Sequence, residues 1–105
     1  MRLNLRIAAL CVAALIAVPG FAQGSGVETY TGKCAPCHGA DGLAAMPAGK
    51  ALKAASFKTP ALVKAPDAEL MGAIENGKNK MPAWKGKLTD DQIKGVLAYI
   101  RTLQK

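Results

Sequence analysis

The run Cys34-Ala35-Pro36-Cys37-His38 constrains this chain more than any other feature of its sequence. Two thiols with two residues between them lie on one turn of a helix, so each can add to one vinyl group of the same porphyrin ring. The imidazole of the next residue then lies over the ring face, where it can ligate iron. A C-x-x-C-H run is the attachment signature of a c-type haem. The sequence therefore predicts one covalent haem c on Cys34 and Cys37, with His38 as an axial ligand.

The two cysteines also fit two other kinds of site. A C-x-x-C pair with a proline before its second cysteine suits a thioredoxin-like thiol oxidoreductase, which places the pair after an apolar strand. Residues 24–33 are mostly polar and predict no such strand. A C-x-x-C is also half of a zinc site, but His38 is the only histidine and Cys11 is the only other cysteine.

The first 22 residues have the features of a signal peptide. Two arginines precede an uncharged apolar run over residues 7–18, and Pro19-Gly20 ends that run. The run is shorter than the roughly 20 residues that a transmembrane helix needs, although an uncleaved N-terminal anchor is the alternative. We expect residues 1–22 to be removed on export to the periplasm. A single domain of residues 23–105 would be left, with no membrane span.

The exported domain would be small and basic. Its two remaining cysteines both lie in the motif, and a disulfide between them would close too short a loop to stabilise the fold. A covalent haem would instead supply a large apolar body for the chain to wrap. Loss of the two N-terminal arginines lowers the net charge from +7 to +5, which favours acidic partners. The lysines follow no arginine-rich or aromatic-interleaved pattern, which argues against nucleic-acid binding.

The hydrophobic pattern predicts helices and no strands. A first helix is expected over residues 26–34, begun by a capping box of Ser25 and Glu28. A loop rich in glycine, alanine and proline should follow over residues 39–50. A short helix is then expected over residues 51–57, ended by a Thr-Pro pair.

Two further helices are expected in the second half of the chain. One has Pro66 at its first position and Gly77 just beyond its end. A loop over residues 76–87 leads to the last helix, which Thr89 and Gln92 begin as a capping box. Apolar residues then recur with helical spacing at Ile93, Val96, Leu97 and Ile100.

A second axial ligand is predicted among the three methionines that would remain after removal of residues 1–22. A thioether is a soft, neutral ligand that favours reduced iron and keeps small molecules out. Met71 lies on an apolar helix face and is expected to fill the core, and Met46 follows His38 too closely to reach the opposite ring face easily. Met81 lies farther away in a loop where Pro82 restricts the backbone. The sequence therefore favours Met81, with packing on the core as its alternative role.

Three segments together resemble the small class I c-type cytochromes of bacteria. They are the motif at 34–39, the run NGKNKMPAW at 76–84 and the capped helix over 88–103. The resemblance covers nearly all of residues 24–105, and the order and spacing of the segments are specific. It implies an all-α, cytochrome c-like fold with three to four helices wrapped around one covalent haem. The N- and C-terminal helices would cross, at Gly26, Tyr30 and either Leu97 or Tyr99.

The resemblance also implies roles for two residues around the haem. Pro47 lies nine residues after His38, where the proline of small bacterial members offers its carbonyl to the free N–H of the histidine. Trp84 stands where members often have Phe or Tyr, a mild departure, and should pack near the haem.

The flanks of Met81 carry lysines that serve either solubility alone or docking around an exposed haem edge. These are Lys78, Lys80, Lys85 and Lys87. With both axial positions filled, substrate has no open iron site. We therefore interpret the chain as a periplasmic electron carrier and not an enzyme. It would be a monomer, or form transient complexes with an acidic oxidase, reductase or dehydrogenase.

Three alternatives to a free carrier stay open at this stage. The first is a cytochrome subunit held permanently by a periplasmic dehydrogenase. The second is a thioredoxin-like oxidoreductase that uses Cys34 and Cys37 as its thiols. The third is a haem peroxidase or sensor, which requires an open or replaceable sixth ligand.

Overall fold

The computed structural model describes residues 21–105, and within this range the chain is helical and forms no β-strand. The expected signal peptide, residues 1–22, lies almost entirely outside the described residues. The described helices are α1 (Phe21–Lys33), α2 (Ala35–His38), α3 (Pro47–Ala51), α4 (Pro60–Lys64), α5 (Asp67–Asn76) and α6 (Asp90–Leu103). The prediction of an all-α fold is confirmed.

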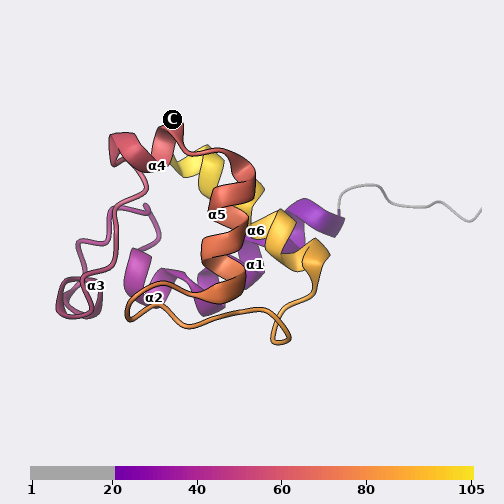
Figure 1. Cartoon of the computed structure of the whole chain (residues 1–105), viewed down its shortest axis with the longest axis horizontal. Coiled ribbons are helices and arrows are strands. Elements are labelled where there is room, and N and C mark those ends of the chain that lie inside the picture. Colours follow the sequence, from indigo (N-terminus) through magenta and orange to yellow (C-terminus); the bar gives the residue numbers. More distant parts are fainter. Residues whose placement is uncertain (1–20) are drawn as a thin grey trace, which may run out of the picture.

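The first and last of these helices form the centre of the fold (Figure 1). Helix α1 packs chiefly on α6, α5 packs on the same α6, and α2 lies between α1 and α3. The core between them is apolar, with Tyr30, Ile93 and Val96 almost completely buried. No helix within residues 21–105 has both the length and the apolar character needed to cross a membrane.

Helix α6 begins at the capping box that the sequence predicted. The Gln92 backbone N–H donates to Thr89 Oγ1 at 3.1 Å, and the Thr89 N–H donates to Gln92 Oε1 at 2.8 Å. These bonds satisfy N–H groups that the helix geometry leaves without partners. The buried face that follows, from Ile93 to Ile100, is the predicted apolar stripe.

The crossing of α1 and α6 depends on two glycines in contact. A Cβ atom on Gly26 would lie 2.5 Å from the carbonyl oxygen of Gly95, so only glycine lets the backbones approach this closely. One turn farther along α1, the ring of Tyr30 meets that of Tyr99 edge-on, with centroids 5.1 Å apart. The predicted crossing is thus confirmed with Tyr99 facing Tyr30, while Gly95 was not anticipated.

The start of the first helix was predicted wrongly. Helix α1 begins at Phe21, so Ser25 lies inside the helix and cannot serve as its N-cap. A capping residue must have a non-helical backbone, which a residue in the second turn lacks. The alanine and glutamine before Ser25 are good helix formers, and they extend the helix in the N-terminal direction.

The short helices between residues 39 and 66 were also misplaced. The expected helix over 51–57 is wrong, because α3 ends at Ala51 and turns follow it. Pro47 and Pro60 each occupy the first turn of a helix, where the fixed φ of proline is favourable. Helix α4 was not predicted, because Pro60 was expected to end a helix and not to begin one. Pro66 is the N-cap of α5 and not its first residue, whereas the predicted C-terminal glycine, Gly77, has the expected positive φ of 72°.

We expect Gly26→Ala to lower the free energy of unfolding of the haem-loaded protein by about 1–3 kcal/mol, because the new methyl group overlaps the Gly95 carbonyl. Gly32→Ala is the matched control in the same helix, since a Cβ there meets no atom within 4 Å. It should leave stability unchanged or raise it by up to about 1 kcal/mol. Urea unfolding of the three proteins measures both effects. Equal stability of the two variants would contradict the close crossing.

Candidate haem site

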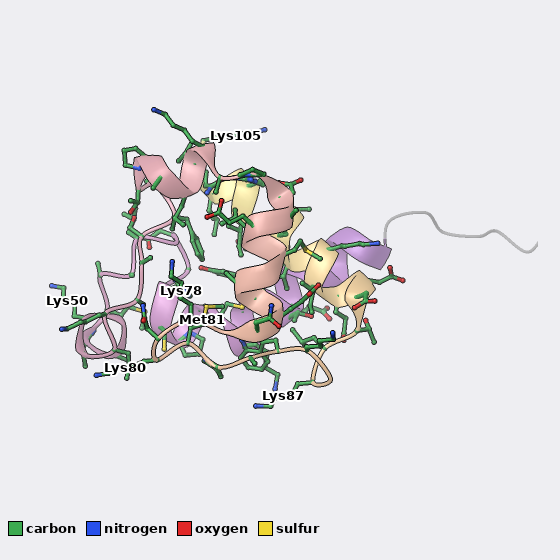
Figure 2. The ribbon with its side chains drawn as sticks, viewed as in Figure 1. Lys50, Lys78, Lys80, Met81, Lys87 and Lys105 are labelled. Carbon is green, nitrogen blue, oxygen red and sulfur yellow. The ribbon has the colours of Figure 1, made fainter. Side chains whose placement is uncertain are left out.

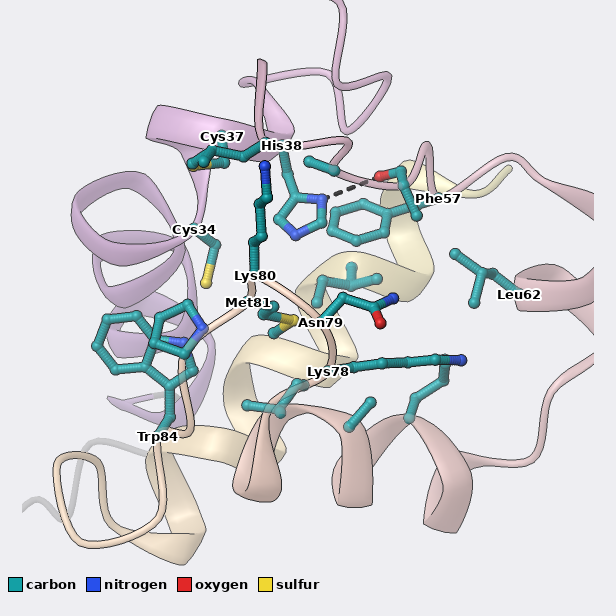
Figure 3. Close-up of a pocket in the computed structure, with 18 of the residues that line it drawn as sticks. Cys34, Cys37, His38, Phe57, Leu62, Lys78, Asn79, Lys80, Met81 and Trp84 are labelled. Carbon is teal, nitrogen blue, oxygen red and sulfur yellow. Dashed lines mark hydrogen bonds between the residues drawn. The ribbon is translucent and has the colours of Figure 1, made fainter. Parts of the chain in front are cut away.

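A cavity of roughly 380 Å³ lies between the C-x-x-C-H turn, α5, α6 and the loop after α5 (Figure 3). This volume is within the range of about 300–1,000 Å³ that is typical of ligand pockets. Cys34, Cys37, His38, Met81 and Trp84 all line the cavity. The fold thus brings together two segments that lie some 40 positions apart in the sequence, and it unites five of the six predicted site residues.

The C-x-x-C-H motif forms a single helical turn directly after α1. The His38 backbone N–H donates to the carbonyl of Cys34 at 2.9 Å, which closes the turn and puts both cysteines and the histidine on one short helix. Gly39, with a φ of 82°, ends it. The buried hydroxyl of Tyr30 donates to the Gly39 carbonyl at 2.6 Å. This bond ties the end of the motif to the core of the helix crossing.

The two cysteines are free thiols, and Cys34 is buried. Burial, with a smaller contribution from the nearby Cys37, raises the pKa of Cys34 to about 11. A catalytic dithiol needs a lowered pKa, because the thiolate is the nucleophile. The environment of Cys34 therefore disfavours the thioredoxin-like alternative, while it suits a thiol that is converted into a buried thioether.

The ring of His38 is held in one orientation by two contacts. Its Nδ1 lies 3.0 Å from the carbonyl oxygen of Ala55, and a carbonyl can only accept, so the proton is on Nδ1. The ring stacks on Phe57 with centroids 4.6 Å apart and an interplanar angle of 22°. Burial lowers the pKa of His38, opposed in part by the hydrogen bond to Ala55. A neutral imidazole with its Nε2 lone pair available is the form that ligates a metal.

The predicted hydrogen bond from His38 to the carbonyl of Pro47 is wrong, because Ala55 takes that place. Pro47 does not line the cavity and instead begins α3. A Cβ on Gly49, in the same helix, would overlap the Cys37 carbonyl. The backbone of α3 therefore packs directly on the motif. The turn after α3 places the Ala55 carbonyl beside the imidazole of His38.

Met81 lies in a tight turn that its own backbone closes. The Met81 N–H donates to the Lys78 carbonyl at 2.9 Å, and the Lys78 N–H donates to the Met81 carbonyl at 3.2 Å. Three residues farther on, the Trp84 N–H donates to the carbonyl of Ile74 at 3.0 Å, which fixes the loop against α5. Met46, in contrast, is 47% exposed and does not line the cavity. Met71 is partly buried and packs on the core.

The residues around the cavity fit a haem c. They provide two thiols, one neutral imidazole and one thioether, between walls of Phe57, Leu62, Leu70, Ile74, Leu97 and Ile100. Within the described range of the chain, no group of three His, Cys, Asp or Glu side chains has an arrangement that could hold a metal ion directly. Ala55, Phe57 and Gln104 at this site were not predicted from the sequence, because no motif marks them. Ala55 and Phe57 were expected in a helix over residues 51–57.

An all-α fold that brings a C-x-x-C-H turn and a methionine loop to one apolar cavity defines a c-type cytochrome. Over residues 22–100 the chain matches the family described as cytochrome C oxidase, cbb3-type, subunit III. It is 38% identical over 76 residues to cytochrome c6 of Synechococcus elongatus, covering 72% of this chain and 84% of that protein. It is 33% identical over 98 residues to cytochrome c6 of Thermosynechococcus vestitus, covering 90% and 85%.

The chain belongs to the family of small monohaem class I c-type cytochromes. A further relative, cytochrome c6 of a Synechococcus species, is 36% identical over 105 residues and spans 95% of this chain and 91% of its own length. The predicted family, the covalent haem c and the role as an electron carrier are confirmed, and the chain is not an enzyme. When bound, the haem iron supplies one-electron redox chemistry.

The haem should remain with the polypeptide after acid–acetone extraction of protein made in an export-competent host. The physical reason is that thioether bonds to Cys34 and Cys37 survive a treatment that removes haem held only by ligation. Mass spectrometry should find the mature chain plus one haem. A Cys34→Ser, Cys37→Ser double variant should lose the colour on extraction. Complete extraction of haem from the wild-type protein would contradict covalent attachment.

Proposed function

We propose that this chain is a free periplasmic electron carrier in which His38 and Met81 ligate the haem iron and Cys34 and Cys37 hold the ring. The observation that carries this proposal is the convergence of all four side chains on one cavity from two separate segments (Figure 3). Trp84 would pack against the ring from the same loop as Met81. Pro47 would act only indirectly, because it begins α3 and this helix packs on the motif at the Cys37 carbonyl.

The two axial side chains have different tasks. His38 offers a neutral Nε2 whose direction Ala55 and Phe57 set. Met81 offers a soft thioether from a turn that Gly77 and its hydrogen bonds hold rigid. If His38 and Met81 both hold the haem iron, no position on the metal would be left for a substrate or a small molecule, and electron exchange would be limited to the ring edge. This supports a carrier over a peroxidase or a sensor.

The mouth of the cavity is basic, which supports an acidic partner. The cavity lining includes the lysines Lys33, Lys53, Lys78 and Lys80 and no acidic side chain. Two of these belong to the predicted docking ring, whereas Lys85 and Lys87 do not line the cavity, and the Lys87 ammonium lies over the Trp84 ring, 5.6 Å from its centroid. Figure 2 shows Lys78 and Lys80 beside Met81, and Lys105 at the opposite end of the molecule.

The export of the protein rests on residues 1–22, whose charge and apolar run favour a cleaved signal peptide. The similarity of this chain to proteins named cytochrome c6 supports a free carrier over a subunit held permanently by a dehydrogenase. A domain of this size with a net charge of +5 suits weak, fast-exchanging contacts with acidic redox proteins. Such complexes have a small interface area, and electrostatic steering speeds their association.

Met81→Ala should abolish the Met-to-iron charge-transfer band of the oxidised protein and lower its reduction potential. The potential should fall by a sizeable part of the roughly 0.8 V that axial ligands span, because the thioether favours reduced iron. Met46→Ala is the matched control, since this side chain is exposed outside the cavity. It should leave the band and the potential unchanged. Loss of the band in the Met46 variant alone would assign the ligand to the loop after His38.

Neutralising the cavity-mouth lysines should slow electron transfer to an acidic partner about tenfold or more at low salt, and little at high salt. The reason is that steering between opposite charges weakens as the Debye length shortens to about 8 Å at physiological ionic strength. In the variant, four lysines are replaced by glutamine: Lys33, Lys53, Lys78 and Lys80. Stopped-flow rates against ionic strength provide the measurement.

A control with the same net charge tests whether position matters. In this control, glutamine replaces four lysines that do not line the cavity: Lys58, Lys64, Lys94 and Lys105. This variant should retain most of the wild-type rate at every ionic strength, and neither set should alter the visible spectrum. If the two sets slow the reaction equally, net charge alone is responsible, and the basic mouth is not a docking surface.

A further inference from the structure

The imidazole of His38 depends on a short non-helical segment, residues 54–57, that follows α3. Ala55 accepts the hydrogen bond from Nδ1 at 3.0 Å, and the Phe57 ring stacks on the imidazole at 4.6 Å. Both contacts come from one stretch of four residues. Any shift of this segment therefore rotates the imidazole and changes the direction of its Nε2 lone pair.

The position of this segment is set in part by the last residues of the chain. The side-chain amide of Gln104 donates from Nε2 to the Phe57 carbonyl at 3.1 Å. Its Oε1 accepts from Arg101 Nη1 at 2.9 Å. A carbonyl only accepts and a guanidinium only donates, so these two neighbours allow one orientation of the amide. Gln104 also lines the cavity, directly after the end of α6.

Arg101 is itself firmly held. Its guanidinium forms an ion pair with Asp67 at 2.9 Å and donates to the carbonyls of Leu62 and Ala65. These bonds join α6 to the end of α4 and the start of α5. Because Arg101 is held in place, it fixes the position of the Gln104 amide that donates to Phe57.

Few other bonds hold the segment. Backbone N–H groups of Ala54 and Phe57 donate to the carbonyls of Gly49 and Gly42. Apart from His38, Gln104 makes the only side-chain hydrogen bond that reaches residues 54–57 from elsewhere in the described part of the chain. Loss of this one bond frees the Phe57 carbonyl while the helices remain intact.

We propose that Gln104 is a positioning residue that tunes the reduction potential through Phe57 and His38. By holding residues 54–57 in place, it maintains the Nδ1–H donation to Ala55, which makes the imidazole a more basic ligand. A more basic ligand stabilises oxidised iron over reduced iron, so Gln104 keeps the potential low. This inference rests on the proposed ligation by His38.

The test compares haem-loaded Gln104→Met and Gln104→Asn with the wild-type protein. Methionine has nearly the same length but makes neither hydrogen bond, and asparagine is too short to bridge both neighbours. Each variant should raise the midpoint potential. A tenfold decrease in the equilibrium preference for oxidised over reduced iron corresponds to a rise of about 59 mV. Each should also speed the exchange of the His38 Nδ1 proton with solvent, followed by NMR of the reduced protein.

Gln92→Met is the matched control near the other end of α6. It breaks the capping box of α6 and should lower stability, yet it should leave the potential and the proton exchange at their wild-type values. Wild-type potential and exchange in both Gln104 variants would overturn the proposal, as would an equal change in Gln92→Met. Failure of both Gln104 variants to load haem while Gln92→Met loads normally would also overturn it, because the role would then be structural.

The visible spectrum of the wild-type protein separates this inference from the proposed function. A wild-type protein without a low-spin His–Met signature would contradict the ligand set itself. A normal wild-type signature with unaltered Gln104 variants would contradict only the positioning role of Gln104.

Discussion

The contact between the backbones of Gly26 and Gly95 is the constraint on which the rest of the structure depends. It brings α1 and α6 together at their crossing, and α6 lines the cavity with Leu97 and Ile100. The C-x-x-C-H turn follows α1 directly, and Gln104 follows α6. Tyr30 joins the two parts, because its ring packs in the crossing and its hydroxyl holds the end of the motif. The positions of the side chains that line the cavity thus depend on the packing of the helices.

Burial and charge divide the site into two zones with different functions. Inside, the thiol of Cys34 and the imidazole of His38 are both disfavoured in their charged forms, which suits groups that bond covalently or by a lone pair. At the mouth of the cavity, four lysines are exposed to solvent and make the surrounding surface positively charged. An apolar interior with a charged rim is the arrangement expected of a protein that exchanges electrons through brief encounters.

Local patterns in the sequence identified the elements whose causes are local. The capping box at Thr89 and Gln92, the glycine after α5 and the apolar stripe of α6 all depend on residues within one or two turns of each other. The short helices were harder, because a proline begins α3 and α4, and the same residue type also ends helices. The false capping box at Ser25 shows the same limit, since a matching pair of residues did not decide where α1 starts.

The sequence by itself determined the family and its covalent haem c, because two thiols and an imidazole in a C-x-x-C-H run are recognisable from residue type and spacing. Only the tertiary structure decided which neighbours orient them. The partner of His38 is Ala55 and not Pro47, and the partner of Gly26 is Gly95. Neither choice follows from the residue type, because any backbone carbonyl can accept a hydrogen bond and any glycine permits close approach. Such contacts are selected by the path of the chain in space, which arises from the packing of all helices together.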